Sequence, residues 1–424
     1  METPRSEGSI KICLITSKHA IRDSRVFGCF YQGIVSAGGE AIIIGPFTDE
    51  GDRAGDVRSV CLPVSCSANQ DTLGSPRLAC QRLMALAHLF RWCLRLRPDV
   101  IQACEPDSWV VAWLAARAYG GRAVFDVHEM YPAYLAGKFR SSWRPRAEAR
   151  LIGVFRWLLA RADAVFHVSA ERKAYYMAPE GNHFVVPSYP SLRIAEISRD
   201  SRDRGAIDFV HLGKVVEPES RRVLLGAMAR CRAAGRPFTV AIVGQRLDEF
   251  NKGLRADQLA AVDGMLRWCA PLPHRQALEI AATARLGLAL YDSDTASRNI
   301  VASRKLYEYM ALGLPVIGTR VAGVTELIEG NGIGIVVPLE AEALASAMLR
   351  LAGDPELARR CAAAGRAAFL ERYNWEAQSG WLMSAYASLS AYRRRGGRKH
   401  VRFPQVTQPA RDASSVLSDK AGSR

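Results

Sequence analysis

The sequence predicts an α/β protein of two doubly wound domains, each a parallel sheet with helices on both faces, that meet at a cleft. The first observation is that short apolar runs alternate with stretches of helical periodicity in each half of the chain. Such alternation predicts parallel strands because each helix returns the chain to the same edge of the sheet. The second is size, since 424 residues that are 49% hydrophobic and 23% charged suffice for two cores.

The first half is predicted to begin as strand, helix, strand. An apolar run at 10–15 precedes a helical stretch at 23–37, which a Gly-Gly pair ends before the apolar run at 41–44. The same order then returns, again with a Gly-Gly pair behind the helix. The other predicted elements of this half are strands at 100–101, 123–127, 164–168 and 184–186 and a helix at 107–118.

The second half repeats this order after a segment, 187–204, that is rich in Pro, Ser and Arg and lacks periodicity. Its predicted elements are strands at 208–212, 238–243, 286–290 and 315–317 and helices at 221–233 and 303–312. We expect the carboxyl ends of both sheets to face a shared cleft, where ligands of such folds bind. The chain therefore divides into a disordered start at 1–9, a first domain at 10–190, a linker at 191–204, a second domain at 205–376, a C-terminal helix at 377–392 and a basic, disordered tail at 393–424.

Charge and cysteine content narrow the possible functions. Lys and Arg number 57 against 42 Asp and Glu, and the net charge of +15 favours an anionic partner. The ten cysteines form no C-x-x-C pair, which argues against a zinc site and for reduced thiols in a cytosolic protein. We expect neither a secretion signal nor a membrane span, because the apolar runs are too short.

The most informative segment is SRKLYEYMALGLPVIGT at 303–319. Lys305 and Glu308 share one helical face near the predicted helix start, while Leu306 can pack inward. A cation beside exposed helix N–H groups suits a diphosphate, and a carboxylate one turn later can accept two hydrogen bonds from a ribose diol. The alternative is a surface ion pair, which is the commoner role of Lys and Glu at this spacing.

This segment closely resembles the donor-binding KLFEYMAxGLPVI motif of family 4 glycosyltransferases, and similar segments follow in family order over about residues 10 to 376. In the first half these are KHAIRDSRVF at 18–27, which resembles DTRIF, FDVHEMYP at 125–132, which resembles YDVHEDYP, and ADAVFHVS at 162–169, which resembles ADxVIxVS. In the second half they are LGK at 212–214, at the place of a Gly-Arg or Gly-Lys turn, GVTELI at 323–328, which resembles GVPELI, and YNWE at 373–376, which resembles FSWE.

The resemblance implies a GT-B fold and retaining transfer of a sugar from a nucleotide sugar to an acceptor hydroxyl, with no metal and no other cofactor. The first domain would lie on the acceptor side and the second would bind the nucleotide sugar. Fixed cations would stabilise the leaving diphosphate, namely Lys214, Lys305 and either Arg221 or Arg222, of which we favour Arg222. The positions implied to bind the nucleotide sugar are Gly213, Lys305, Leu306, Glu308 and Arg25.

His128 follows a predicted strand and so lies at the carboxyl end of the first sheet. In related enzymes the matching His hydrogen-bonds the transferred sugar or orients the acceptor. The alternative is a strand-end His satisfied by backbone groups, and Glu129 is a candidate to fix its tautomer. Asp23 is expected to cap the following helix, and Arg25 is a candidate to contact phosphate or sugar.

The sequence departs from the family at one position. Many family members carry a glutamate eight residues before the one that matches Glu308, where it contacts the donor sugar, but here this residue is Ile300. We therefore expect the loop at 293–299 to read the donor sugar, which leaves the sugar open. Asp292-Ser-Asp294 mimics the metal-binding D-x-D of the other large glycosyltransferase fold, but in a GT-B protein it is a loop.

Two basic segments bear on the acceptor. Residues 75–97 contain five arginines and no acid, and residues 138–161 contain seven Lys or Arg against Glu148. Both also carry Trp, Phe and Leu, a combination that suits the headgroup region of an anionic membrane. The alternative is a helix packed on the sheet with a solvated basic rim. Nucleic-acid binding is not expected because no recognition module is present.

The sequence therefore predicts a cytoplasmic glycosyltransferase, peripherally bound to the inner face of the membrane. We expect it to transfer a sugar, from a UDP-sugar rather than a GDP-sugar, to a lipid-linked or surface-glycan (polysaccharide) precursor. One alternative is a nucleotide-sugar 2-epimerase of the same architecture, which needs no acceptor. Another is a non-catalytic carbohydrate-binding relative, against which Lys305, Glu308 and His128 argue.

Overall fold

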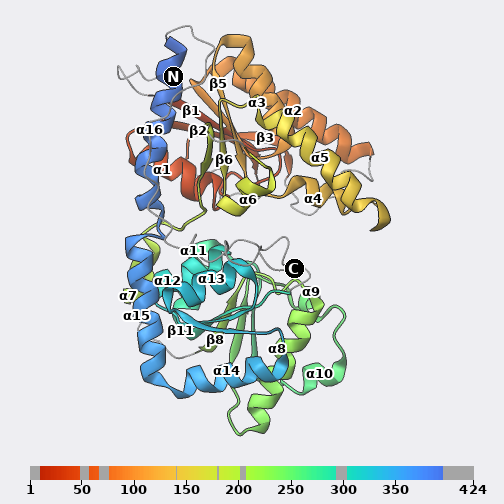
Figure 1. Ribbon diagram of the computed structural model, residues 1–424, viewed down its shortest axis with the longest axis vertical. Helices are drawn as coiled ribbons and strands as arrows, with labels where there is room; N and C mark the ends of the chain where they lie inside the picture. Colours follow the sequence, from red (N-terminus) through yellow and green to blue (C-terminus); the bar gives the residue numbers. More distant parts are fainter. Residues whose placement is uncertain are drawn as a thin grey trace, which may run out of the picture.

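The computed structural model describes residues 10–47, 57–65, 76–139, 141–178, 181–200, 207–292 and 303–394. It consists of two α/β domains stacked along the long axis of the molecule (Figure 1). The N-terminal domain contains a 7-stranded parallel sheet and the C-terminal domain a 6-stranded one, which confirms the predicted fold class. None of the helices among these residues is long and apolar enough to cross a membrane.

The N-terminal sheet has the strand order β3-β2-β1-β4-β5-β6-β7. Its order reverses between β1 and β4, and in doubly wound sheets ligands bind beside such a reversal, at the carboxyl ends of the strands. The strands are β1 (Lys11–Ile15), β2 (Glu40–Phe47), β3 (Ser59–Ser65), β4 (Val100–Ala103), β5 (Arg122–Val127), β6 (Ala164–His167) and β7 (His183–Val185).

Helices cover both faces of this sheet. The π-helix η1 (Val26–Tyr31) and α1 (Gln32–Ser36) pack on one face, whereas α2, α3 and α5 pack on the other. The remaining bounds are α2 (Pro76–Leu96), α3 (Pro106–Tyr119), α4 (Tyr131–Ala136), the 3-10 helix η4 (Ser141–Trp143), α5 (Arg144–Leu159) and α6 (Ala170–Tyr175).

The C-terminal sheet has the order β10-β9-β8-β11-β12-β13 and reverses between β8 and β11. Its strands are β8 (Ile207–Leu212), β9 (Val240–Val243), β10 (Leu266–Cys269), β11 (Ala284–Ala289), β12 (Val316–Thr319) and β13 (Gly334–Val337). The helices are α7 (Ile194–Asp200), α8 (Pro218–Ala233), α9 (Leu247–Asn251), α10 (Ala256–Ala260), α11 (His274–Ala282), α12 (Arg304–Leu312), α13 (Ala322–Asn331), α14 (Ala341–Gly353) and α15 (Pro355–Glu371).

The last described helix, α16 (Trp375–Arg394), returns to the N-terminal domain (Figure 1). Its Leu382, Tyr386 and Leu389 are buried against the first sheet, and the Tyr386 hydroxyl donates to Gln102 of β4. Where the chain crosses back, the Trp375 N–H donates to the Pro190 carbonyl at 2.9 Å. The C-terminal helix thus completes the core of the first domain.

Two parts of the structure differ from the sequence-based expectation. The segment expected as a linker contains α7, which packs on α11 and α12 because Ile194 and Ala195 are buried in the second core. The sequence also did not reveal β3, β10 and β13. All three are edge strands, and Pro63 in β3 is tolerated there because an edge strand has one side without a neighbouring strand to receive a backbone N–H.

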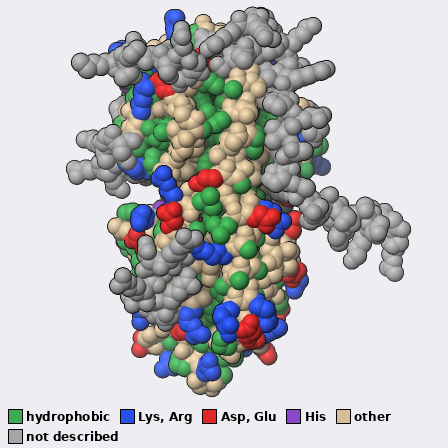
Figure 2. All heavy atoms as spheres, turned by 90° about the vertical axis from the view of Figure 1, so that its left-hand side faces the viewer, with side chains coloured by type: hydrophobic (Ala, Val, Ile, Leu, Met, Phe, Trp, Pro, Cys, Tyr) green, Lys and Arg blue, Asp and Glu red, His purple; other side chains and the backbone are tan. Residues whose placement is uncertain are grey.

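Figure 2 shows the face along which α15 and α16 run. Over the C-terminal domain, in the lower half, charged side chains of both signs are interspersed. Over the N-terminal domain the described part of this face shows mainly hydrophobic side chains together with backbone and uncharged polar side chains. The basic helices α2 and α5 lie on the other side of the first sheet.

Candidate active site

A cavity of about 320 Å³ lies between the two domains, beside the strand reversal of the first sheet. The N-terminal domain contributes most of its lining, including His19, Arg25 and His128. The C-terminal domain contributes Ser303, Arg304 and Tyr307 from the start of α12. The predicted cleft between the carboxyl ends of the two sheets is therefore present.

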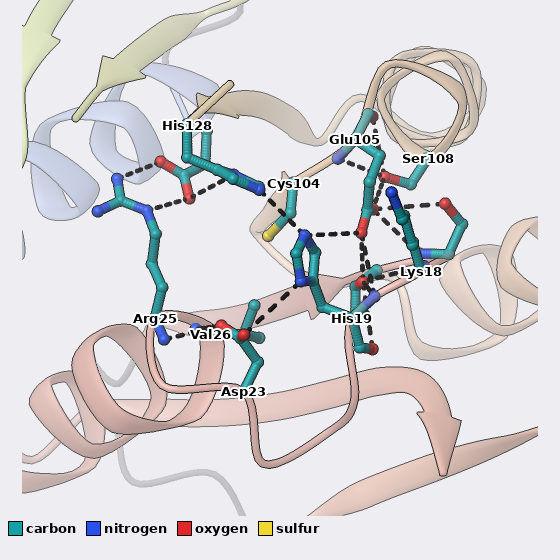
Figure 3. A network of polar contacts seen from close by, with 12 residues as sticks. Lys18, His19, Asp23, Arg25, Val26, Cys104, Glu105, Ser108 and His128 are labelled. Atoms are coloured by element: carbon teal, nitrogen blue, oxygen red, sulfur yellow. Dashed lines mark hydrogen bonds and ion pairs between the residues drawn. The ribbon is translucent and has the colours of Figure 1, made fainter. Parts of the chain in front are cut away.

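His128, directly after β5, is paired with a second histidine. Its Nε2 atom lies 3.0 Å from the Nε2 atom of His19, and the two rings meet edge to face (Figure 3). One imidazole must donate and the other accept, so the pair shares one proton between the two nitrogens. His128 Nδ1 has no hydrogen-bond partner among the described residues and lies 4.0 Å from Asp126 Oδ2.

Two carboxylates surround His19. Asp23 Oδ2 lies 3.6 Å from its Nδ1, and Glu105 Oε1 lies 3.7 Å from its Nε2 (Figure 3). Glu105, two residues after β4, is itself held by hydrogen bonds from Thr16 Oγ1 at 2.6 Å and Ser108 Oγ at 2.8 Å. His19 therefore sits in a fixed, negatively charged environment.

These surroundings move the pKa values of the two histidines in opposite directions. Burial disfavours a protonated His19, but the Asp23 hydrogen bond and the Glu105 charge outweigh it and raise its pKa. Burial, followed by the charges of His19 and Arg25, holds the pKa of His128 well below its usual value. The shared proton is therefore on Nε2 of His19, which donates a hydrogen bond to Nε2 of His128. His128 is neutral and carries its own proton on Nδ1.

Arg25 positions the site through protein contacts. Its Nε donates to Asp126 Oδ2 at 2.7 Å, and its Nη1 donates to the Val186 carbonyl at 3.0 Å and Ser188 Oγ at 2.7 Å. The predicted phosphate or sugar contact would have to compete with these bonds. Asp23 accepts from the N–H groups of Arg25 at 2.7 Å and Val26 at 3.1 Å, as expected of a cap.

Glu129 does not fix the His128 tautomer. Its side chain is 61% exposed and lies 3.8 Å from Arg172. The partner of His128 is instead His19, which the sequence-based interpretation missed. The sequence offers one indication of this role, because His19 lies within the 18–27 segment, four residues before Asp23.

A second cavity, of about 350 Å³, adjoins the first on the N-terminal domain. The two cavities share His19, His128 and Glu129. The start of α4 and the residue before it add Met130, Tyr131, Ala133 and Tyr134, and the segments after β1 and β4 add the charged Lys18 and Glu105. The histidine pair therefore stands between an interdomain cavity and a more apolar one.

In the C-terminal domain, the turn after β8 lies against α12. Gly213 has a φ of +75°, a left-handed conformation that glycine adopts without strain. Tyr309 of α12 fixes the turn, because its hydroxyl accepts from the Leu212 N–H at 2.8 Å and lies 3.1 Å from the carbonyls of Val210 and Leu288. The predicted Gly213 turn and the predicted donor helix are thus joined by one buried side chain.

Lys305 lies beside the strand reversal of the second sheet. Its Nζ is 3.4 Å from Nε2 of His211, the buried residue two before Gly213, and 5.2 Å from the centre of the Tyr291 ring. Burial lowers the pKa of Lys305 to about 8, against the opposing charges of Glu308 and Glu217. A bound diphosphate would add further negative charge beside this ammonium group and favour its protonated form.

Glu308 is buried and held by hydrogen bonds from two side chains. Its Oε1 accepts from His274 Nε2 at 2.8 Å and from Arg304 Nε at 3.0 Å. Burial alone would raise the pKa of Glu308, but the His274 hydrogen bond and the Arg304 charge outweigh it and lower the pKa. Within the described part of the chain, Oε2 receives no hydrogen bond, so an ionised oxygen is available to a ligand.

The other predicted cations differ in accessibility. Lys214 is half-exposed and pairs with Glu249 Oε2 at 2.8 Å, and Arg222 is exposed and paired with Glu219. Arg221 instead points inward and donates from Nη1 to the carbonyls of three residues in the segment 249–252. Arg222 is therefore a surface cation and Arg221 a buried one, and the contact of Arg222 with phosphate stays a prediction.

Leu306 is fully buried in the core of the C-terminal domain. Its side chain packs inward as predicted, so a contact between this residue and a nucleotide would have to come from its backbone. The loop expected to read the donor sugar, 293–299, and Ile300 lie outside the described residues. So does Asp294 of the D-x-D mimic. The described residues include no group of three or more His, Cys, Asp or Glu side chains placed to hold a metal ion.

The chain matches two families of sequence. Residues 26–187 match the glycosyl transferase 4-like domain, and residues 206–354 match the glycosyl transferases group 1 family. It is also similar to a D-inositol 3-phosphate glycosyltransferase of Streptomyces griseus subsp. griseus, with 26% identity over 341 residues, which are 72% of this chain and 71% of that protein.

Two solved structures share the fold. The sucrose-phosphate synthase of Thermosynechococcus elongatus superimposes with a TM-score of 0.68 at 18% identity, over 91% of this chain and 100% of the other. Anabaena Alr3699/HepE in complex with UDP-glucose superimposes with a TM-score of 0.63 at 16% identity, over 89% of this chain and 100% of the other. These likenesses confirm the predicted GT-B architecture.

Proposed function

Because this chain belongs to the glycosyltransferases of the 4-like and group 1 families, we propose that it transfers a sugar from a nucleotide sugar, with retention, to a hydroxyl of a lipid-linked or surface-glycan precursor. The observation that supports binding of the nucleotide-sugar donor is the arrangement of Glu308. This buried carboxylate has one oxygen held by His274 and Arg304 and the other available to a ligand. A fixed, ionised oxygen next to a helix start suits a ribose diol.

The leaving group of such a reaction is a nucleoside diphosphate, whose charge must be stabilised as the bond to the sugar breaks. Lys305 is the first candidate, since burial lowers its pKa and a bound diphosphate would favour its charged form. Lys214 and Arg222 would give up their half-exposed ion pairs to reach the diphosphate. This exchange costs little, because surface ion pairs contribute only about 0 to 1 kcal/mol.

A UDP-sugar is favoured over a GDP-sugar. The Anabaena structure with a similar fold binds UDP-glucose, which agrees with this preference. The cations that would serve the diphosphate belong to the protein, so the proposed reaction needs no metal and no other cofactor.

We place the acceptor on the N-terminal side, in the second cavity. His128, which both cavities share, would bind the transferred sugar or orient the acceptor hydroxyl. The apolar start of α4 would receive the aglycone side of a lipid-linked or glycan acceptor.

The proposal also includes peripheral attachment to the inner face of an anionic membrane. On α5, Phe155 and Leu159 are buried in the first core, whereas much of the rest of the helix surface is exposed. Trp143 is 60% and Trp157 55% exposed, among the exposed arginines 144, 146, 150 and 156. Aromatic side chains among arginines suit the headgroup region of such a membrane.

A panel of nucleotide sugars tests the function. Purified protein would be incubated with each donor and with isolated membranes as acceptor, and nucleoside diphosphate release and product mass would be measured. Release from one donor that depends on membranes supports the proposal. Conversion of a nucleotide sugar without acceptor would instead indicate a 2-epimerase, and binding without turnover would indicate a non-catalytic relative.

A further inference from the structure

Arg304, the first residue of α12, spans the two domains. Its Nε donates to Glu308 Oε1 at 3.0 Å within its own helix. Its Nη1 donates across the cleft to the Ser24 carbonyl at 3.2 Å and lies 3.5 Å from Cys29 Sγ. The side chain is only 20% exposed, so a single guanidinium group is shared between the domains in a partly desolvated place.

On the N-terminal domain, Arg304 contacts Ser24, which lies in the loop next to the histidine pair. Ser24 stands between Asp23, whose carboxylate lies 3.6 Å from His19 Nδ1, and Arg25, which holds Asp126 next to His128 (Figure 3). A shift of the Ser24 carbonyl therefore moves both neighbours of the pair.

On the C-terminal domain, Arg304 contacts Glu308, the carboxylate proposed to bind ribose. Glu308 Oε1 is shared by Arg304 and His274, so the orientation of Oε2 depends on both donors. His274 contacts Glu308 within the C-terminal domain, whereas Arg304 also contacts the other domain. One side chain thus connects the donor site to the His19–His128 site.

We propose that Arg304 is a positioning residue that couples the nucleotide-binding Glu308 to the His19–His128 pair across the cleft. This inference rests on the proposed function. When the ribose engages Oε2, Glu308 and Arg304 are held in one arrangement, and the Ser24 loop with the histidine pair is held against the donor. Without Arg304 each domain keeps its own site, but the two sites lose their fixed relation.

The experiment measures the coupling with a double-mutant cycle. The variants are Arg304→Ala, Arg304→Lys, His19→Asn and the double variant, and the probes are UDP binding by calorimetry and kcat and KM for donor and acceptor. We expect Arg304→Ala to lower kcat about tenfold in the wild-type background and less than about threefold in the His19→Asn background, because the coupling has already been lost there. In Arg304→Lys the single ammonium group cannot contact Glu308 and Ser24 at once. Relative to Arg304→Ala, this variant should therefore restore UDP binding more than it restores kcat.

Controls separate this inference from the proposed function and from misfolding. Arg285→Ala removes an arginine whose hydrogen bonds within the described part of the chain go to Asp208 and Ala352 of its own domain, and should leave kcat unchanged. If Glu308→Gln leaves UDP binding unchanged, the nucleotide site itself is wrong. Suppose instead that Glu308→Gln weakens UDP binding, but Arg304→Ala lowers kcat by the same factor with and without His19→Asn. The proposed coupling is then wrong, and the nucleotide site stands. Equal thermal unfolding midpoints show that each variant is folded.

Discussion

The Nε2 atoms of His19 and His128 lie 3.0 Å apart, although the two residues follow strands β1 and β5, which are separated in the sheet by β4. Glu105, which follows β4, lies 3.7 Å from His19 Nε2, and Asp23 and Glu105 together raise the pKa of His19 against its burial. The pair is thus built by three parallel strands that end at the same edge.

The proton on His19 predicts opposite titrations for the two rings. In ¹⁵N spectra of the imidazoles, His19 should titrate above the ordinary pKa of a histidine. His128 should stay neutral at pH values well below that ordinary pKa, because its pKa is lowered. Since its pKa is raised in the folded state, protonated His19 stabilises the fold fully below the unfolded pKa of about 6.5, and this stabilisation is lost as pH rises through the folded pKa. Asp23→Asn should lower the pKa of His19, whereas Glu129→Gln, which removes a carboxylate paired with Arg172, should move it much less.

Removing the charge of Glu308 or Lys305 should abolish most transfer while the fold remains. We expect Glu308→Gln and Lys305→Ala each to reduce kcat/KM by an amount equivalent to about 2 to 4 kcal/mol, because one ribose or diphosphate contact is lost. Glu279→Gln, an exposed acid on α11, serves as the matched control. Wild-type turnover in folded Glu308 and Lys305 variants would overturn this assignment.

Binding of UDP should weaken as pH rises above about 8, because Lys305 then loses the proton that the diphosphate needs. Below this pKa the ammonium group is charged and affinity should be flat until phosphate or Glu308 protonates. Calorimetry at several pH values measures the effect. In Lys305→Arg the cation stays charged, so the alkaline loss of affinity should disappear; an unchanged pH profile in this variant would show that another group titrates.

Transfer should survive EDTA, since protein cations are proposed to stabilise the leaving diphosphate. Turnover of the preferred donor would be followed before and after chelation, with added Mn²⁺ as the second arm. Loss of activity that Mn²⁺ restores would mean that Asp292 and Asp294 bind a metal after all.

Binding to anionic vesicles should depend on α5 and on the basic C-terminal segment. Residues 393–424 contain nine Lys or Arg and two acids, and each basic residue near an anionic surface contributes about 1 kcal/mol. Replacing Trp143 and Trp157 by Glu, or deleting residues 395–424, should reduce sedimentation with anionic but not neutral vesicles. Leu370→Glu on α15, an equally drastic change at an exposed site, should have no effect. Sedimentation that neither variant nor raised salt alters would exclude both surfaces.

The sequence predicted most strands and the helix that carries Lys305 and Glu308 because these depend on local periodicity. It could not predict the partners that complete the site. His274 reaches Glu308 over 34 positions and Arg304 reaches Ser24 over 280, and no local pattern encodes such pairings. His19 lay within a recognised motif, but its role required the strand order that brings the ends of β1 and β5 together.

The return of α16 to the first domain has a consequence for the order of folding. Gly33 in α1 leaves room for the indole of Trp375, which a Cβ atom there would strike, and Phe30 meets that indole edge to face at 5.5 Å. During synthesis the first sheet emerges long before α16, and until then the apolar surface of η1, α1 and β4 that the helix covers stays open to solvent. The C-terminal domain can close its sheet from contiguous sequence, so it is the N-terminal domain, although made first, that must wait for the last helix to finish its core.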